Sequence, residues 1–590
     1  MTSPRAEPGG LLARAFAQAL LRLERRLGEG DRAGQGHEPP GCGHTGPAGR
    51  DPEAPASREA TLATWAERVW KAAADGHACV AVDEAGARER LASCRVVAVD
   101  GRAALPLVLD GAALYLQRLW QAESGLAASL VALDAAAPLA TADTIDALLA
   151  EVAAPEAVDE RQRAAIRTAL MRRLAVVTGG PGTGKTTTLA RLLVAFSRLA
   201  PDARVAIAAP TGKAAARLAQ ALGEQLGRID ASGALSARLP SAGLTVHRLL
   251  GLRGSASRLA QALRYDLVIV DEASMLDLEM AAALAASIPD GGRLVLAGDR
   301  DQLASVEAGA VFAEACASPL EGVVRLQRNY RQASAPALTA LSGWLRDRHR
   351  APQALPAPFA PAAGVELRTP RGASAIADQA LAAWEPALAR VASGDHAGPA
   401  QAVSIVAAFE RHRVLCAMRE GPLGVEALNA AIAARVRERV GAPPGALWYP
   451  GRIVIVVRNR PELELANGDV GICLPLPAAA SDAATAPLAV VFDTGGGALR
   501  WLPVRQMPAH DDAFAMTVHK AQGSEFDSVA LVAAPRGHRL NTRELLYTGA
   551  TRARSRLVVW AEPTAIEDGA MRRTERHGRL ADRIARLRES

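Results

Sequence analysis

Several shortages in this 590-residue chain exclude whole classes of protein. No stretch of about 18 uncharged apolar residues occurs, so we expect no membrane-spanning helix and no membrane partner. The apolar segment at 11–23 contains arginines and lacks a small-residue cleavage site, which predicts an amphipathic helix rather than a signal peptide. The six cysteines form no CxxC pair, so neither a disulfide framework nor a structural metal is expected, and a reducing cytoplasm is the predicted compartment.

Lysine is scarce as well, because only four of the 68 Lys and Arg residues are lysines. A GC-rich genome would favour Ala, Gly and Arg in this way without any selection on function. A lysine that persists against that bias marks a position where arginine does not serve, since an ammonium is a compact point charge and a guanidinium is a wide planar fork. Lys185, Lys213 and Lys520 all lie in the motifs described below. The net charge of +6 is compatible with a nucleic-acid partner.

The chain changes composition along its length, and its size requires several domains. Residues 1–27 predict a helix, residues 28–60 are rich in Gly, Pro and charge and predict a disordered linker, and residues 61–150 predict a small helical module. From residue 155 onward, short β-rich segments alternate with helical ones, which predicts an α/β fold with parallel sheets. The predicted strands are 174–178, 205–210, 267–272, 294–299, 323–326, 404–408, 528–533 and 557–561.

Two later regions depart from this alternation. Residues 440–510 contain short apolar runs separated by Gly, Asn and Asp, a pattern that predicts a small β-barrel insert. Residues 571–590 predict a basic helix, which is either a solvated end helix or a binding element.

The strongest chemical signal is a glycine-rich loop between a predicted strand and a predicted helix. It consists of Gly179, Gly180, Pro181, Gly182, Thr183, Gly184, Lys185 and Thr186. Glycines let backbone N–H groups converge on phosphate oxygens, and the start of the helix adds a favourable dipole. Lys185 is placed to reach the β- and γ-phosphates of ATP, and Thr186 is placed to ligate Mg²⁺. The alternative is a plain strand-to-helix turn, but the complete motif in this context favours a phosphate-binding loop.

Two adjacent acids follow the apolar run LVIV at 267–270. A phosphate-binding loop needs a carboxylate at the end of a nearby strand, and Asp271 is the candidate ligand for magnesium. Glu272 is the candidate that polarises the attacking water. Acids at strand ends are often solvated turn residues, but the apolar strand just before this pair favours the catalytic interpretation.

Further segments supply candidates for contact with the γ-phosphate. Asp299 and Gln302 follow the predicted strand at 294–299, and Gln302 is placed to sense the γ-phosphate. Arg331 and Arg552 could each bring positive charge to the transition state, which is worth about 10³–10⁵ in rate in phosphoryl transfer. In a chain so rich in arginine, either residue taken alone could equally be an ordinary surface arginine.

In order along the chain, these segments resemble the motifs of superfamily 1 DNA helicases. The matching segments are 209–218 (APTGKAAARL), 245–250 (TVHRLL), 271–275 (DEASM), 298–306 (GDRDQLASV), 516–526 (MTVHKAQGSEF) and 545–554 (LLYTGATRAR). Their wording resembles the RecD group, which moves 5′ to 3′ along single-stranded DNA. The segment DERQRAAI at 159–166 resembles the upstream element in which Gln162 would read the adenine edge; the alternative is an ordinary glutamine at a helix start.

The resemblance implies two RecA-like lobes that enclose ATP and Mg²⁺. Residues 151–345 would form the first lobe, residues 346–439 and 511–590 the second lobe with its basic tail, and residues 440–510 an SH3-like barrel inserted into the second lobe. The first lobe would carry the phosphate loop, Asp271, Glu272 and Gln302, and the second would present Arg331 and Arg552 across the cleft. The implied DNA contacts, mostly to the backbone of the strand, are Thr211, Lys213, His247, Thr517, His519 and Glu525.

The segment PLVLDGAALYLQRLWQAE at 106–123 resembles the front domain of the RecD subunit of exonuclease V. This resemblance implies the motor subunit of a RecBCD-type heterotrimer with RecB-like and RecC-like partners, acting on single-stranded DNA and on double-stranded DNA unwound from its ends. Residues 1–150 would be the partner-docking region. Because no cluster of acids and lysine has the spacing of a two-metal nuclease site, any nuclease activity is expected to come from a partner.

Two alternatives to this function remain. One is a free-standing repair helicase of the same group. The other is a scaffold that keeps the fold without hydrolysis, against which the intact set of Lys185, Asp271, Glu272, Arg331 and Arg552 argues.

The docking prediction also rests on an apolar stripe in the N-terminal module. On a helix, Leu116, Leu119 and Trp120 would share one face at i, i+3 and i+4. They would form either the core of the module itself or an anchor presented to a partner subunit.

Overall fold

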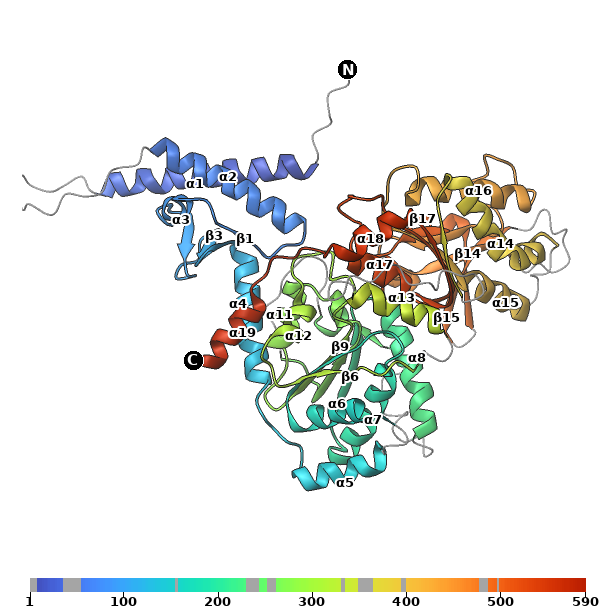
Figure 1. The fold of residues 1–590 in the computed structure, drawn as a ribbon, viewed down its shortest axis with the longest axis horizontal. Coiled ribbons are helices and arrows are strands. Elements are labelled where there is room, and N and C mark those ends of the chain that lie inside the picture. The colour runs from blue at the N-terminus through green and yellow to red at the C-terminus, as the bar shows by residue number, and fades with distance from the viewer. Residues whose placement is uncertain are drawn as a thin grey trace, which may run out of the picture.

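The computed structural model describes residues 8–34, 55–153, 158–229, 243–251, 262–330, 335–347, 364–393, 399–476, 487–495 and 498–590. The chain forms an N-terminal module, a first α/β lobe and a second α/β lobe that carries an antiparallel insert (Figure 1). This arrangement confirms the predicted α/β class. Among the residues described, no helix is both long enough and apolar enough to cross a membrane.

The first lobe is built on a six-stranded sheet with the order β10-β5-β9-β8-β6-β7, in which all neighbours are parallel. The strands are β5 (Leu174–Thr178), β6 (Val205–Ala209), β7 (Leu244–Thr245), β8 (Leu267–Val270), β9 (Arg293–Gly298) and β10 (Val323–Arg325). The helical elements are α5 (Ala142–Val152), α6 (Glu160–Met171), α7 (Lys185–Leu199), α8 (Gly212–Ile229), α10 (Val246–Leu249), η1 (Ala273–Met275), α11 (Leu278–Ala286) and α12 (Val311–Ala317). The five strands predicted between residues 174 and 326 are therefore confirmed.

Each face of this sheet is covered by different helices, because successive strand residues point to opposite sides. Val177 and Ile207 pack into a core with α5, α6, α7 and α8, whereas Val176 and Ala208 pack into a second core with α11 and α12. The strands are buried on both faces, which explains why they read in the sequence as continuous apolar runs.

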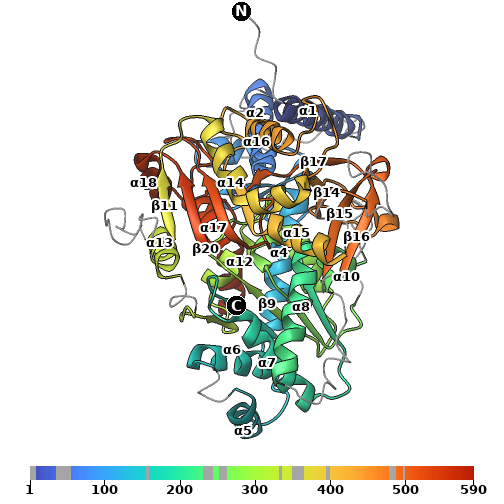
Figure 2. The ribbon, with the colours of Figure 1, turned by 90° about the vertical axis from the view of Figure 1, so that its right-hand side faces the viewer.

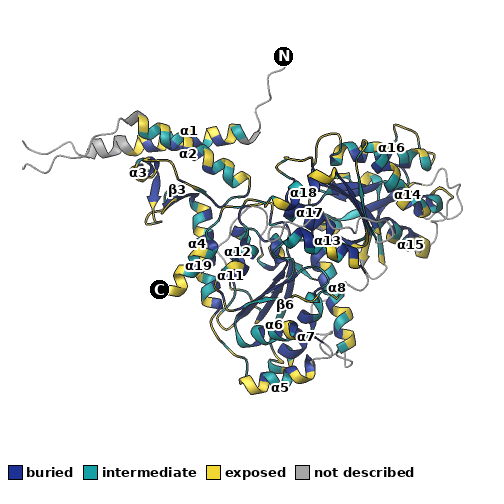
Figure 3. Cartoon of the chain, viewed as in Figure 1, coloured by how far each residue is buried: buried dark blue, intermediate teal, exposed yellow. Residues whose placement is uncertain are grey.

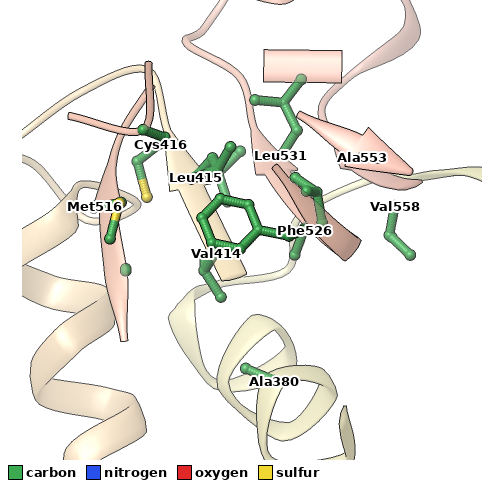
Figure 4. Packing of buried hydrophobic residues seen from close by; sticks show 14 of the residues in the cluster. Ala380, Val414, Leu415, Cys416, Met516, Phe526, Leu531, Ala553 and Val558 are labelled. Atoms are coloured by element: carbon green, nitrogen blue, oxygen red, sulfur yellow. The ribbon is translucent and has the colours of Figure 1, made fainter. Parts of the chain in front are cut away.

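The second lobe is a parallel sheet with the order β11-β20-β19-β12-β18. Its strands are β11 (Val365–Arg368), β12 (His412–Cys416), β18 (Ala515–Thr517), β19 (Phe526–Val532) and β20 (Ala553–Trp560). Its helices are α13 (Pro336–Asp347), α14 (Ala373–Ala392), α15 (Pro399–Glu410), α16 (Val425–Arg439), α17 (Arg543–Ala550) and α18 (Pro563–Met571). Val414, Met516 and Leu531 from three different strands meet in its core (Figure 4).

Two predictions for this region are wrong: the position of one strand and the boundary between the lobes. Residues 404–408 were expected to form a strand, but they lie in α15, and the strand is β12, which begins two residues after the helix ends. The buried residues Ala402, Ile405, Val406 and Phe409 recur at helical spacing, which is the signal that distinguishes the two structures. The first lobe was also expected to reach residue 345, but α13 packs into the core of the second lobe.

The insert is an antiparallel sheet with the order β16-β15-β14-β13-β17. It consists of β13 (Ile453–Val456), η3 (Pro461–Leu463), β14 (Val470–Pro475), β15 (Leu488–Gly495), β16 (Ala498–Pro503), η4 (Val504–Gln506) and β17 (His510–Asp512). One face has a small core of its own that includes Val454 and Phe492, and the other face joins the core of the second lobe. The predicted short strands are present, and their likeness to an SH3 barrel stays a prediction.

The N-terminal module is more than the helical module and linker that the sequence predicted. Its elements are α1 (Pro8–Gly34), α2 (Pro55–Ala74), β1 (Cys79–Ala81), α3 (Ala87–Ala92), β2 (Val97–Val99), β3 (Leu107–Asp110), β4 (Ala113–Leu116) and α4 (Gln117–Leu133). The strands form a sheet with the order β1-β4-β3-β2. Residues 28–34 and 55–60, predicted to be linker, belong to α1 and α2, and residues 35–54 lie outside the described residues.

A hairpin explains why a helix was the wrong prediction for the segment around residue 112. Gly111 and Ala112 form the two-residue turn between β3 and β4, where Asp110 pairs with Ala113, and Gly111 has a φ of 57°, which suits a tight hairpin turn. Leu116 therefore ends a strand, while Leu119 and Trp120 lie in α4. Leu116 and Leu119 are buried inside the module, as the alternative interpretation of this stripe stated.

The module shares one core with the first lobe. Leu126 and Leu130 of α4 pack in the same cluster as Leu284 of α11 and Phe312 of α12. Both views of the ribbon show α4 lying against the first lobe (Figure 1, Figure 2). The carboxylate of Asp134, at the end of α4, accepts hydrogen bonds from the backbone N–H groups of Glu321 and Gly322 at 2.8 and 2.7 Å. The module therefore covers one face of the first lobe and is not a separate appendage.

The C-terminal helix α19 (Leu580–Glu589) follows the second lobe in the sequence, but it lies beside α4 of the N-terminal module (Figure 1). Arg583 is mostly buried and forms ion pairs of 2.7 Å with both Asp110 and Glu123 of the module. The predicted basic helix is thus present, but it is not a solvated end helix, because its basic side chains hold the two ends of the chain together. Most of its exposed surface is at its last turn (Figure 3).

Candidate functional site

The phosphate loop connects the end of β5 to the start of α7, as predicted. Gly182 and Gly184 have φ values of 77° and 79°, a backbone conformation that side-chain-bearing residues rarely adopt. The ammonium of Lys185 donates hydrogen bonds to the carbonyls of Gly179 and Gly180 at 2.6 and 3.2 Å, which holds it above the loop. A cavity of about 370 Å³ opens beside the loop, and Gly182, Gly184, Lys185 and Thr186 are among its lining residues.

The two acids after β8 line the same cavity. One oxygen of Asp271 is buried and has no hydrogen-bond partner among the residues that the structure describes, and burial, reinforced by the adjacent Glu272, raises the pKa of this carboxyl to about 6. Glu272 has a φ of 52°, in the left-handed region that costs a residue with a side chain of this kind about 1 kcal/mol or more. Such strain is typical of a side chain that the fold aims at a reacting group.

Gln162 makes hydrogen bonds to the phosphate loop. Its side-chain oxygen accepts from the backbone N–H of Asp159, which completes a capping box at the start of α6. Its amide nitrogen donates to the carbonyls of Thr183 and Gly184 at 3.3 and 3.4 Å. Gln162 thus fixes α6 to the phosphate loop, and the reading of adenine by this residue stays a prediction.

The segment after β9 joins the two lobes. Asp299 is 1% exposed, and its carboxylate accepts from Gln302 at 3.2 Å and from the hydroxyl of Tyr547, in α17 of the second lobe, at 2.9 Å. The side chain of Thr548 accepts from the backbone N–H of Leu303 at 2.8 Å, again across the lobes. Gln302 lines the cavity beside Lys185, so the second lobe contacts the segment that faces the nucleotide site.

The second lobe contributes its own side chains to the cavity. Arg552 lines it, and its guanidinium donates to the carbonyls of Thr548 and Ser524, both at 3.2 Å. Glu525, expected to contact DNA, also lines this cavity and pairs with Arg217 of the first lobe and with Arg554. The structure therefore places Glu525 at the nucleotide cleft. Arg331 lies outside the described residues.

The first-lobe candidates for DNA contact lie at the boundary with the second lobe. Thr211 caps the start of α8, where its hydroxyl accepts from the backbone N–H of Ala214 at 3.2 Å. Burial lowers the pKa of Lys213, although Glu410 and Asp469 of the second lobe oppose this shift. His247 is apart from both, on the short helix α10.

Thr517 and His519 lie on one segment but face two different cavities. Thr517 and Lys520 line a cavity of about 320 Å³ whose charged residues include Asp511 and Asp512 of the insert. His519 lines a cavity of about 480 Å³ on the other side of the segment. The sequence could not distinguish these two environments.

Two tyrosines of the site were missed. Tyr547 contacts Asp299, and Tyr330 lies with its hydroxyl 3.0 Å from the side-chain oxygen of Gln162 and is 45% exposed at the mouth of the cavity. The signal that could have found them is scarcity, since the chain has only five tyrosines, of which Tyr547 lies in a helicase-like motif and Tyr330 directly precedes Arg331.

Comparison with known proteins identifies the family. The model of an AAA domain matches residues 157–357, and that of a UvrD-like helicase C-terminal domain matches residues 512–560. The RecBCD enzyme subunit RecD of Mycobacterium tuberculosis is 36% identical over 506 residues, which cover 80% of each chain. The RecD subunit of Mycolicibacterium smegmatis is 37% identical over 496 residues, covering 80% of this chain and 83% of that one.

A third relative is the ATP-dependent RecD2 DNA helicase of Deinococcus radiodurans, which is 32% identical over 484 residues, or 80% of this chain and 58% of the relative. Because these identities extend over four fifths of the chain and include both lobes that form the nucleotide cleft, the chain belongs to the RecD family of ATP-dependent DNA helicases.

Proposed function

We propose that this chain hydrolyses ATP to move 5′ to 3′ along single-stranded DNA, as the motor subunit of a RecBCD-type exonuclease V that acts on double-stranded DNA ends in recombinational repair. One observation carries the proposal: a single cavity is lined by Lys185, Asp271 and Glu272 of the first lobe and by Arg552 of the second. A site assembled from both lobes can convert a change in the nucleotide into a movement of one lobe against the other.

Each side chain has a role that follows from its position. Lys185 would give up its bonds to the loop carbonyls and neutralise the β- and γ-phosphates. Glu272 would accept a proton from the attacking water, and Gln302 would orient that water or the γ-phosphate. Arg552, together with Arg331, would stabilise the charge of the transition state.

Magnesium fits the acidic side of the cavity. The buried, unpartnered oxygen of Asp271 and the hydroxyl of Thr186 are both hard oxygen ligands, which Mg²⁺ prefers. The ion would supply charge neutralisation at the phosphates. Tyr330, exposed beside Gln162, has an aromatic face on which the adenine ring could stack.

The test of this site is Lys185→Gln with Lys71→Gln as a matched control. Lys71 is a surface residue that pairs with Glu67 at 3.4 Å, so its loss should leave ATPase activity unchanged. Lys185→Gln should nearly abolish ATP hydrolysis stimulated by single-stranded DNA while far-ultraviolet circular dichroism stays the same. Retention of more than about a tenth of wild-type turnover would be too small a loss for this role.

The direction of movement along the DNA strand needs a separate measurement. Partial duplexes with a 5′ or a 3′ overhang should be offered to the purified chain without partner subunits, since a partner motor of opposite polarity would mask the result. Unwinding of the substrate with the 5′ overhang alone is expected, and unwinding of the other substrate alone would contradict the proposal.

We also propose that residues 1–150 dock the chain to RecB-like and RecC-like subunits in a heterotrimer. Leu12, Leu23 and Leu27 are 59%, 37% and 40% exposed and lie along α1 beside the face formed by Ala13, Ala17 and Leu20, which is buried in the module. Deletion of the whole region is a poor test, because it would uncover the core that α4 shares with the first lobe.

The sharper test replaces the three leucines together by serine, with Leu447→Ser as the control. Leu447 is 77% exposed and lies far away in the sequence, in the second lobe. Co-purification with partner subunits from the source cell should be lost for the triple variant alone. A wild-type chain that elutes without partners would instead favour the free-standing helicase.

A further inference from the structure

A basic cavity lies where the N-terminal module, the two lobes and the C-terminal segment meet, and His519 is the one lining residue that has been given a role above. Its volume is about 480 Å³. Its walls come from the N-terminal module (Asp75, His77), the first lobe (Leu303, Ala304), the second lobe (His519, Arg539, Leu540, Thr542, Leu545) and the C-terminal segment that leads to α19 (residues 572–576). The cavity shares no lining residue with the nucleotide cavity beside Lys185.

The charge of the cavity favours an anion. Four arginines line it, at positions 539, 572, 573 and 576, against the two acids Asp75 and Glu575. By contrast, the cavity that contains Thr517 is lined by Arg419 and Lys520 against three acids at positions 426, 511 and 512. A phosphate that approaches the segment from Thr517 to Lys520 is therefore attracted to the side of His519.

Two of the four arginines are available to a ligand. The side chain of Arg539 is 79% exposed and has only a long ion pair of 3.5 Å with Asp75. Arg573 is exposed at the rim. The other two have structural bonds: Arg572 donates to the carbonyls of Gly537 and His538, and Arg576 donates to those of Asp75 and Ser305.

The floor of the cavity connects it to the nucleotide site. Leu303 and Leu545 are buried there, and Leu303 directly follows Gln302, which lines the nucleotide cavity. The backbone N–H of Leu303 is bonded to Thr548 and its carbonyl accepts from Gln522 at 2.9 Å, both across the lobes. A ligand in the basic cavity would thus contact the same segment that senses the nucleotide.

We propose that this cavity binds the sugar-phosphate backbone of single-stranded DNA, with Arg539 and Arg573 contacting phosphates beside His519. The inference rests on the proposed function and extends its DNA track to the C-terminal segment. An apolar floor with a basic rim suits a flexible strand whose sugars and bases lie against Leu303 while its phosphates meet guanidinium groups. The segment at 572–576 then has two roles, because it contacts the DNA and also connects the second lobe to the N-terminal module.

The test measures the binding of a fluorescent oligothymidylate by anisotropy, without nucleotide, at several salt concentrations. The variants are Arg539→Ala, Arg573→Ala, the double variant and Arg573→Glu. Arg204→Ala is the matched control, because the side chain of Arg204 is also largely exposed (62%), has a similarly long ion pair of 3.8 Å with Asp266 and precedes β6 at the opposite end of that strand from the site. Thermal unfolding of each variant shows whether its fold is intact.

Each alanine variant should raise the Kd about three- to tenfold and lower the slope of log Kd against log salt by about 0.7, with the two effects summing in the double variant. Arg573→Glu should weaken binding further, and Arg204→Ala should change neither quantity. Unchanged Kd and slope in the double variant would overturn the inference, as would a loss of partner binding with DNA binding intact. Wild-type protein that binds DNA through these arginines but shows no DNA-stimulated ATPase would refute the proposed function alone.

Discussion

Replacement of Tyr547 by phenylalanine removes one hydrogen bond between the lobes and nothing else. The hydroxyl of Tyr547 donates to Asp299 at 2.9 Å, and both residues are almost fully buried, at 3% and 1% exposure. Burial, together with the neighbouring Asp299, keeps the pKa of Tyr547 well above its usual range, so the hydroxyl remains a donor at any physiological pH. Asp299 keeps its bonds from Gln302 and from the backbone N–H of Asp301.

The size of the effect follows from the kind of bond. A hydrogen bond to a charged group contributes about 1.5–3 kcal/mol, and its loss here leaves part of a buried carboxylate without a donor. The bond exists only while the lobes are together, so this free energy should be lost from the closed state and not from the stability of either lobe. The closed population should fall roughly 10- to 150-fold relative to the open one.

Steady-state ATPase measurements with saturating single-stranded DNA would detect this shift. Tyr547→Phe should raise the KM for ATP by about tenfold or more, because ATP must then close the lobes against a less favourable equilibrium. Tyr449→Phe is the matched control, since the hydroxyl of Tyr449 is buried in the second lobe without a hydrogen-bond partner. If both variants have kcat and KM within twofold of wild type, the bond to Asp299 does not couple the lobes.

Three other predictions concern the proposed catalytic base and the contact between the N-terminal module and the C-terminal helix. Glu272→Gln should keep the binding of a fluorescent ATP analogue but lower phosphate release at least about 100-fold; comparable turnover would exclude Glu272 as the base. Arg583→Met should lower the free energy of unfolding in urea by about 3 kcal/mol, because it leaves Glu123 buried with an uncompensated charge, whereas the exposed Arg586→Met should cost almost nothing. Burial, with Glu123 nearby, raises the pKa of Glu314 from 4.5 to about 7, so folding should be most stable below about pH 4.5 with respect to this group and lose stability as the pH rises to about 7. Glu314→Gln should flatten that part of the stability profile, and an unchanged profile would show that this carboxyl does not titrate in the window.

The order of motifs in the sequence was enough to predict which side chains line the nucleotide site of the first lobe. Residues such as Lys185 and Asp271 lie at fixed places relative to strands that are buried on both faces, and such strands appear in a sequence as unbroken apolar runs. Where a strand ends, the next side chains must emerge at the same edge of the sheet. The order of motifs therefore predicted which groups meet in the first lobe.

Two short segments contain sequence signals for their secondary structure that were overlooked until the structure was compared with the sequence. The glycine at position 111 marks a hairpin turn, and the spacing of Ala402, Ile405 and Phe409 marks a helix. Both segments are short and apolar, and in such segments the preference for helix or strand is weak enough for tertiary packing to decide.

Contacts between segments far apart in the chain could not be predicted from the sequence and are known only from the folded structure. Arg583 reaches Glu123 across 460 positions of the chain, and Glu525 faces Arg217 at the nucleotide cleft while His519, six residues earlier, faces the basic cavity. No periodicity in the sequence encodes such pairings, because they depend on how two lobes and a module dock after each has formed its own elements. An arginine in this chain can be a surface residue, a partner for a buried acid or a contact for a phosphate, and its role is fixed by the groups that the fold brings within a few ångströms of its guanidinium.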